Sequence, residues 1–185
     1  MNNKIIEKCK YLSKYKFKTG IIGVCSGILS LSIVILFFYY ALFLQDTDIN
    51  NKIVGILAFI VFILLILYLF YWSIKRIIIS KKIENDINNN TKNKIIGKPY
   101  NVKISFTYPG IKNNHYIVSN IRLVYKLDNK LINLWMDNIF STEKKIYKDT
   151  IINLLKNESF NISYLTTSKL ITTPLQIEKI IKSYI

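Results

Sequence analysis

Two long apolar runs, separated by only a few residues, constrain this chain more than any other feature. Residues 21–44 read IIGVCSGILSLSIVILFFYYALFL and residues 53–72 read IVGILAFIVFILLILYLFYW, and neither run contains a charged side chain. A bilayer core of ~30 Å needs about 20 apolar residues in a helix, and backbone groups in lipid must be satisfied within the segment. The pattern predicts a transmembrane hairpin with helices at 21–44 and 53–74 and a short extracytoplasmic loop at 45–52.

Aromatic residues at the ends of the runs support the same prediction. They are Phe37, Phe38, Tyr39, Tyr40 and Phe43 in the first run, and Tyr68, Phe70, Tyr71 and Trp72 in the second. Tyr and Trp favour the membrane–water interface, where an apolar ring and a polar tip are both accommodated. The first run exceeds the ~7–15 apolar residues of a signal peptide and lacks an A-x-A-like cleavage site, which disfavours a cleaved leader.

Small residues form a stripe on the first predicted helix and suggest a packing surface. Gly20, Gly23 and Gly27 share one face, Gly23 and Gly27 form a GxxxG pair, and the second run offers Gly55. Glycines let two helix backbones approach closely. We expect this stripe to pack on the second helix of the same chain, with a homodimer through the first helix as the alternative.

The distribution of charge predicts the orientation of the hairpin and its contact with lipid. Asp46 and Asp48 lie in the connecting loop, whereas basic residues flank the outer ends of both runs, including Lys14, Lys16, Lys18, Lys75, Arg76, Lys81 and Lys82. The positive-inside rule places both termini in the cytoplasm, and the basic flanks would attract anionic lipid heads. We therefore expect an integral protein of the cell membrane, with the bilayer as its first partner.

Composition adds little about partners. The chain has 185 residues and a formal charge of +15, and the excess is almost all Lys, alongside abundant Ile and Asn. This bias is typical of an AT-rich bacterial genome, so the Lys excess is weak support for an anionic partner. Outside the hairpin, the remaining length predicts one small soluble domain.

The residues outside the predicted hairpin divide into two flanking segments and one domain. Residues 1–20 are a basic cytoplasmic segment, either a short interfacial helix or a disordered arm. Residues 75–94 begin as a continuation of the second helix and end in an Asn-rich polar run, which predicts a linker. Residues 95–185 are then a β-rich cytoplasmic domain with a C-terminal helix.

Period-two alternation predicts the strands of this domain. Strands are expected at 102–108, 116–127 and 131–136, with a break at Pro109-Gly110 and a tight turn at Asp128-Asn129-Lys130. A helix follows at about 142–157, with Ser141 as N-cap and Glu143 in its first turn, and then short strands at 159–165 and 169–172.

A clear start signal predicts the terminal helix. Thr173 is placed as N-cap, Pro174 at the first helical position, and Gln176 completes a capping box. Its apolar stripe is Ile177, Ile180, Ile181 and Tyr184. We expect this stripe to cover the β domain, and docking on a partner is the alternative that would make it a partner surface.

The order of elements predicts the fold class: a two-helix transmembrane hairpin followed by a small α+β, β-rich domain. Three strands, a helix and two strands match either an OB-like five-stranded barrel or another small α+β sheet. A membrane hairpin followed by a small β domain resembles bacterial membrane-anchored families such as NfeD-type proteins with an OB-like tail. The resemblance covers only the order of elements, so it assigns no functional residue.

No pattern of reactive residues predicts catalysis, a metal or a cofactor. His115 is the only histidine, the two cysteines Cys9 and Cys25 lie in different environments, and no phosphate loop, dinucleotide turn, nucleophile elbow or HExxH helix is present. We expect a non-catalytic interaction or regulatory module held at the membrane by the hairpin, with a protein partner. A small immunity-type or accessory membrane protein is the second hypothesis.

Nucleic-acid binding is the third hypothesis and the least favoured. The domain is basic, and an OB-like sheet could stack bases on Tyr100, Phe106, Tyr108, Tyr116, Tyr125 and Trp135. Phe106, Tyr108 and Tyr125 fall on the apolar face of the alternation, however, and Arg is nearly absent.

Overall fold

The computed structural model describes residues 3–41, 49–107, 116–142 and 148–184. It separates into a helical unit, Glu7–Glu84, and a strand-rich unit, Asn85–Ile185 together with Met1–Ile6. Several expected features lie outside the described residues, namely Asp46, Asp48, the Pro109-Gly110 break, His115 and Glu143.

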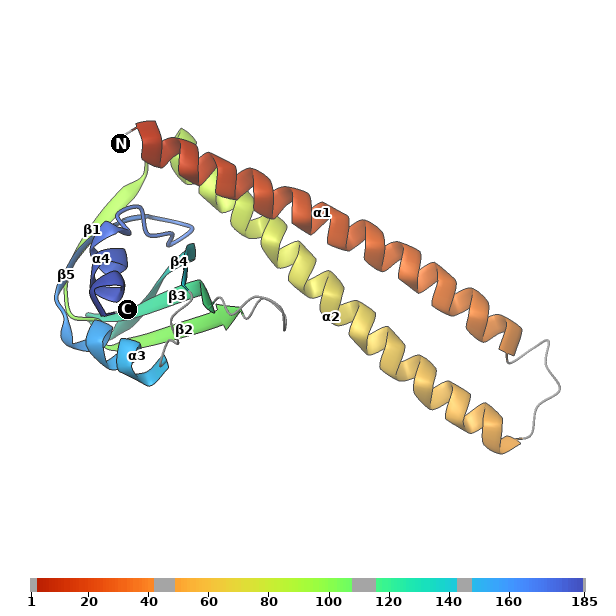
Figure 1. Ribbon diagram of the computed structural model, residues 1–185. Helices are drawn as coiled ribbons and strands as arrows, with labels where there is room; N and C mark the ends of the chain where they lie inside the picture. Colours follow the sequence, from red (N-terminus) through yellow and green to blue (C-terminus); the bar gives the residue numbers. More distant parts are fainter. Residues whose placement is uncertain (1–2, 42–48, 108–115, 143–147, 185) are drawn as a thin grey trace. The chain divides into compact units, whose positions relative to one another are not determined.

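The hairpin consists of helices α1 (Asn3–Tyr39) and α2 (Ile49–Asn88), drawn in Figure 1 from red to yellow-green. At 1.5 Å per residue, their 37 and 40 residues correspond to about 55 and 60 Å, well beyond the ~30 Å of a bilayer core. Residues 3–20 are helical, which agrees with the helix prediction and not with a disordered arm, but they continue α1 without a break and form no separate helix. The linker prediction is also wrong for residues 84–88, which are helical.

Both helices contain a stretch long and apolar enough to cross a membrane. Only 6% of the residues in the most apolar window of each helix are buried, whereas a core helix of a soluble protein is mostly buried. Large apolar side chains such as Leu36 and Leu64 are instead 69% and 61% exposed. The apolar surface of the hairpin therefore points outward.

The strand-rich unit contains two antiparallel sheets (Figure 1). Strand β1 (Lys92–Gly97) pairs with β5 (Phe160–Leu165), and β2 (Asn101–Thr107), β3 (Tyr116–Leu127) and β4 (Lys130–Thr142) form the second sheet in that order. Isolated bridges connect Leu170 to Trp135 in β4 and Ile171 to Tyr164 in β5. The segment around these two residues thus pairs with a strand of each sheet.

The β3–β4 hairpin agrees closely with the sequence pattern. Asp128 and Asn129 have φ values of 44° and 61°, the left-handed conformation that a tight two-residue hairpin turn requires and that Asp and Asn tolerate. The antiparallel pairing of β3 with β4 is confirmed, although β4 is longer than the predicted 131–136. Strand β1 was not predicted, and residues 92–94 belong to it instead of a linker.

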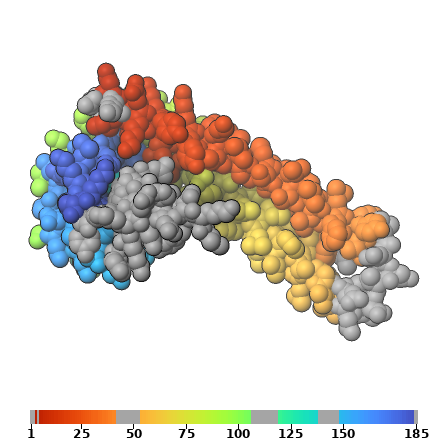
Figure 2. Space-filling model, in the orientation of Figure 1, coloured from red at the N-terminus to blue at the C-terminus, as the bar shows by residue number. Residues whose placement is uncertain are grey.

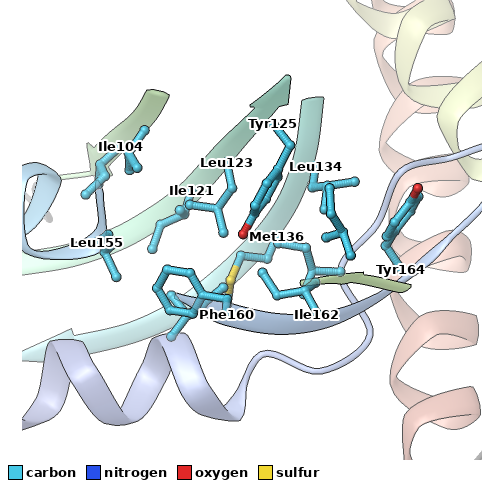
Figure 3. Packing of buried hydrophobic residues seen from close by; sticks show 14 of the residues in the cluster. Ile104, Ile121, Leu123, Tyr125, Leu134, Met136, Leu155, Phe160, Ile162 and Tyr164 are labelled. Atoms are coloured by element: carbon cyan, nitrogen blue, oxygen red, sulfur yellow. The ribbon is translucent and has the colours of Figure 1, made fainter. Parts of the chain in front are cut away.

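One apolar core joins the two sheets with helices α3 (Lys148–Asn157) and α4 (Leu175–Tyr184), and Figure 3 shows part of it. Ile177 and Ile181 of α4 are fully buried in this core, and Ile180 packs against it. They therefore cover the sheet and do not form an exposed partner surface; the side chain of Tyr184 lies outside the described residues. The OB-like barrel stays a prediction, because the described strands form two sheets.

Candidate membrane-interface site

Small residues on α1 allow the two helices of the hairpin to approach closely. A Cβ atom added at Gly20 would lie 2.6 Å from Cγ1 of Ile77 and 2.9 Å from the backbone oxygen of Ser73. One at Gly23 would overlap the Ser73 side chain, and one at Gly27 would meet the Phe70 ring at 3.1 Å. The stripe thus faces α2 of the same chain, as expected. Gly55 has only an ordinary 4.0 Å contact with Phe38.

A pair of serines extends this contact beyond the apolar runs. The Ser13 hydroxyl donates to the Ser80 carbonyl at 3.0 Å, and the Ser80 hydroxyl donates to the Ser13 carbonyl at 2.8 Å. Both side chains are buried, at 6% and 2% exposure. Each serine hydroxyl therefore has its hydrogen-bond acceptor on the opposite helix and does not need a water molecule as a partner.

Heptad spacing connects the serines to the glycine stripe. On α1, Ser13, Gly20 and Gly27 are seven residues apart and all buried, and on α2 the same holds for Ile66, Ser73 and Ser80. A repeat of 3.5 residues keeps one seam in contact along two helices that supercoil around each other. The serine pair was not predicted, although its heptad spacing is present in the sequence. Figure 2 shows the two helices packed along their length.

Basic and aromatic side chains gather where the apolar segments end. The Arg76 guanidinium lies 3.5 Å from the centroid of the Trp72 ring, and the Lys75 ammonium lies 5.8 Å from that of Tyr71. Lys14, Lys18, Lys75, Lys81 and Lys82 are exposed, while Lys16 and Arg76 are half-buried. Such cation–π pairs place positive charge over a ring that itself prefers the membrane interface. We call Lys14, Lys16, Lys18, Lys75 and Arg76 the basic collar.

A buried carboxylate is the main polar feature of the strand-rich unit. Asp86, twelve residues beyond the predicted membrane segment, is fully buried and accepts backbone N–H bonds from Thr167 and from Ser168, the latter at 2.7 Å. The Thr91 hydroxyl donates to it as well, at 2.9 Å. Burial alone would raise the pKa of Asp86, but hydrogen bonds from Ser168 and Thr167 outweigh it and hold the pKa below its usual value. Every donor is a turn or helix-end group, so this carboxylate is an anchor for the turn.

Candidate metal ligands and buried hydroxyl groups are the remaining polar features of the described residues. No three His, Cys, Asp or Glu side chains among them could hold a metal ion. Tyr125 and Ser168 have buried oxygens without a hydrogen-bond partner in the described part of the chain, and burial raises the pKa of Tyr125 to about 12. A neutral phenol surrounded by apolar side chains is not poised for proton transfer (Figure 3).

The aromatic residues proposed to stack bases do not form an exposed platform within the described residues. Tyr125 is buried, the Trp135 indole donates to the Ser168 carbonyl, and Tyr100 is 62% exposed. The side chains of Phe106, Tyr108 and Tyr116 are not among those that the structure describes.

Comparisons with protein-family models, with curated proteins and with solved structures find no match to this chain.

Proposed function

We propose that this chain is an integral membrane protein whose hairpin holds a non-catalytic interaction or regulatory domain at the cytoplasmic membrane surface. One observation carries the proposal. Two charge-free helical segments point their apolar side chains outward, and on both helices these segments end beside the basic collar. Lipid is the solvent that such a surface requires, and the positive-inside rule puts the collar and both termini in the cytoplasm.

The non-catalytic role is supported by the chemistry of the domain. Asp86, its buried carboxylate, anchors a turn, and no group of three potential metal ligands occurs among the described residues. A small immunity-type or accessory membrane protein has the same layout and remains the second proposal. Binding of nucleic acid is less well supported, because Tyr100, at 62% exposure, is the one exposed aromatic side chain among the candidates whose side chains are described.

Cysteine labelling tests the membrane topology. Single cysteines at Asn50 and at Asn88, in a chain whose own two cysteines are replaced, report on the two ends of α2. We expect a membrane-impermeant maleimide to label position 50 in intact cells and position 88 only after permeabilisation. Labelling of position 88 but not position 50 in intact cells would overturn the orientation, and equal labelling in the soluble fraction would overturn membrane insertion.

A further inference from the structure

The two helices of the hairpin bring the basic residues of the collar to one level. Gly20 lies against Ser73 and Ile77, and Ser13 hydrogen-bonds with Ser80. Since these contacts set the antiparallel register, residues 14–19 of α1 run beside residues 74–79 of α2. The five basic residues of the collar therefore occupy a band about one helical turn high, at ~5.4 Å per turn.

No acidic residue lies at the level of the collar in the described parts of the hairpin. Between Lys8 and Lys82 the described residues contain no Asp or Glu, and Glu7 and Glu84 lie about two helical turns beyond the collar. The band is thus strongly electropositive where the apolar surface ends. Anionic groups at this depth would be held by charge and would also lie beside an apolar surface.

The Arg76–Trp72 pair gives the band a phosphate-binding geometry. The central carbon of the guanidinium lies 3.5 Å from the centroid of the indole, a distance that fits stacking of the guanidinium face on the ring. In a stacked arrangement the N–H groups at the edge of the guanidinium plane stay available to a ligand. That edge matches the two oxygens of a phosphate in a bidentate arrangement, which a lysine cannot provide. Trp72 is 46% exposed, so it can contact lipid while it holds the guanidinium.

Resting on the proposed membrane insertion, we propose that the basic collar is a binding site for the headgroup phosphate of anionic phospholipids. Arg76 is the bidentate ligand, Trp72 positions it, and the exposed Lys14, Lys18 and Lys75 provide the surrounding charge. The protein then concentrates anionic lipid around its cytoplasmic end relative to neutral lipid. The collar's position at the boundary of the apolar segments selects a lipid headgroup over a soluble anion.

Fluorescence of Trp72 tests this site in the full-length protein. The chain has two tryptophans, so Trp135→Phe leaves Trp72 as the only tryptophan reporter. This protein is reconstituted into phosphatidylcholine vesicles that contain an equal mole fraction of brominated phosphatidylglycerol or brominated phosphatidylcholine. We expect stronger quenching by the anionic lipid, and Arg76→Gln should reduce its relative association constant about fivefold, the factor for ~1 kcal/mol per basic residue.

Two matched variants separate geometry from charge. Arg76→Lys keeps the charge but loses the planar edge, so its selectivity should lie between those of the parent and Arg76→Gln. Lys126→Gln removes one exposed charge from β3 of the strand-rich unit and should leave selectivity unchanged. Equal quenching by both lipids in the parent protein would overturn the lipid site while membrane insertion stands. Absence of quenching by either lipid would overturn the insertion itself, and an unchanged Arg76→Gln variant would remove Arg76 from the site.

Discussion

The hairpin exposes the same types of apolar side chain that the strand-rich unit buries. Leu36 and Leu64 of the hairpin are 69% and 61% exposed, whereas Leu123 and Leu134 of the sheet are completely buried. The sheet gains free energy by removing apolar area from water, at about 25 cal/mol per Å². An outward-facing leucine gains comparable free energy only if lipid surrounds it in place of water. This is the physical basis of the proposed membrane location.

The difference extends to how each unit is held together. Within lipid, apolar contact offers no net driving force between helices, so close backbone packing and hydrogen bonds must provide it. The glycine contacts of the seam are of this kind, and the paired Ser13 and Ser80 continue the seam outside the apolar runs. The strand-rich unit instead depends on a core of large side chains, with Asp86 as its most deeply buried charge. Four substitutions test this contrast, from the largest expected effect to the smallest.

Ile181→Asp should unfold the strand-rich unit. Ile181 is fully buried in the core, and an aspartate there would be an unpaired buried charge, which we expect to cost at least ~3 kcal/mol. Leu175→Asp, on the same helix at 67% exposure, is the matched control and should be neutral. Limited proteolysis and near-ultraviolet circular dichroism of the full chain in detergent distinguish the two. An intact core in Ile181→Asp would contradict the role of α4 as its cover.

Asp86→Asn should destabilise the strand-rich unit by about 1–3 kcal/mol, because an amide offers one acceptor oxygen in place of two and leaves buried N–H groups unsatisfied. Denaturation is followed by Trp135 fluorescence in a Trp72→Phe background. Asp128→Asn, in a turn where Asn also tolerates positive φ, is the control and should change little.

The same variant predicts a change in pH dependence. The pKa of Asp86 is lowered in the folded chain, so its contribution to stability is complete above the unfolded value of about 3.9 and is lost as pH falls through the lower folded pKa. Asp86→Asn should remove this acid-dependent loss. Parallel acid-unfolding curves for the parent and the variant would show that Asp86 is not the titrating group.

Gly20→Leu should open the hairpin seam. Its Cβ would meet a backbone oxygen of Ser73, which cannot rotate away, and overpacking of this kind costs typically 1–3 kcal/mol. Disulfide formation between cysteines at positions 13 and 80 should fall in this variant. Ser26→Leu, at an exposed position on the same helix, should preserve the cross-link. Equal cross-linking in both variants would show that the glycine contact is dispensable.

Tyr125→Phe should have the smallest effect and should be neutral or slightly stabilising. Its buried hydroxyl has no partner among the described residues, so the substitution removes an unsatisfied group at an estimated gain of up to ~1 kcal/mol. The folded pKa of about 12 lies above the unfolded value of about 10, so the parent loses stability as pH rises through this range. The phenylalanine variant should show no such loss of stability at high pH. A clear destabilisation of this variant at neutral pH would instead show that the Tyr125 hydroxyl has a hydrogen-bond partner.

Local sequence predicted the elements whose signals are complete within a few residues. The apolar runs, the alternation in β3 and the Asp128-Asn129 turn each contain their own period or backbone preference. The terminal helix was also located, but Thr173 and Gln176 accept N–H bonds from Ser163 and Asn161 of β5. The same side chains that suggested a capping box therefore connect the helix region to a strand.

By itself, the sequence determined that two charge-free apolar helices precede a domain of alternating strands, because residue period and charge are local properties. Only the tertiary structure decided that α2 extends to Asn88, that residues 92–97 form a strand, and that the glycine stripe faces α2. Asp86 accepts hydrogen bonds from Thr167 and Ser168, which lie 81 and 82 positions further along the sequence. Strand β1 likewise pairs with β5, which is distant from it in the sequence. Such distant partners stabilise a polar, Asn-rich segment that local pattern alone reads as a linker.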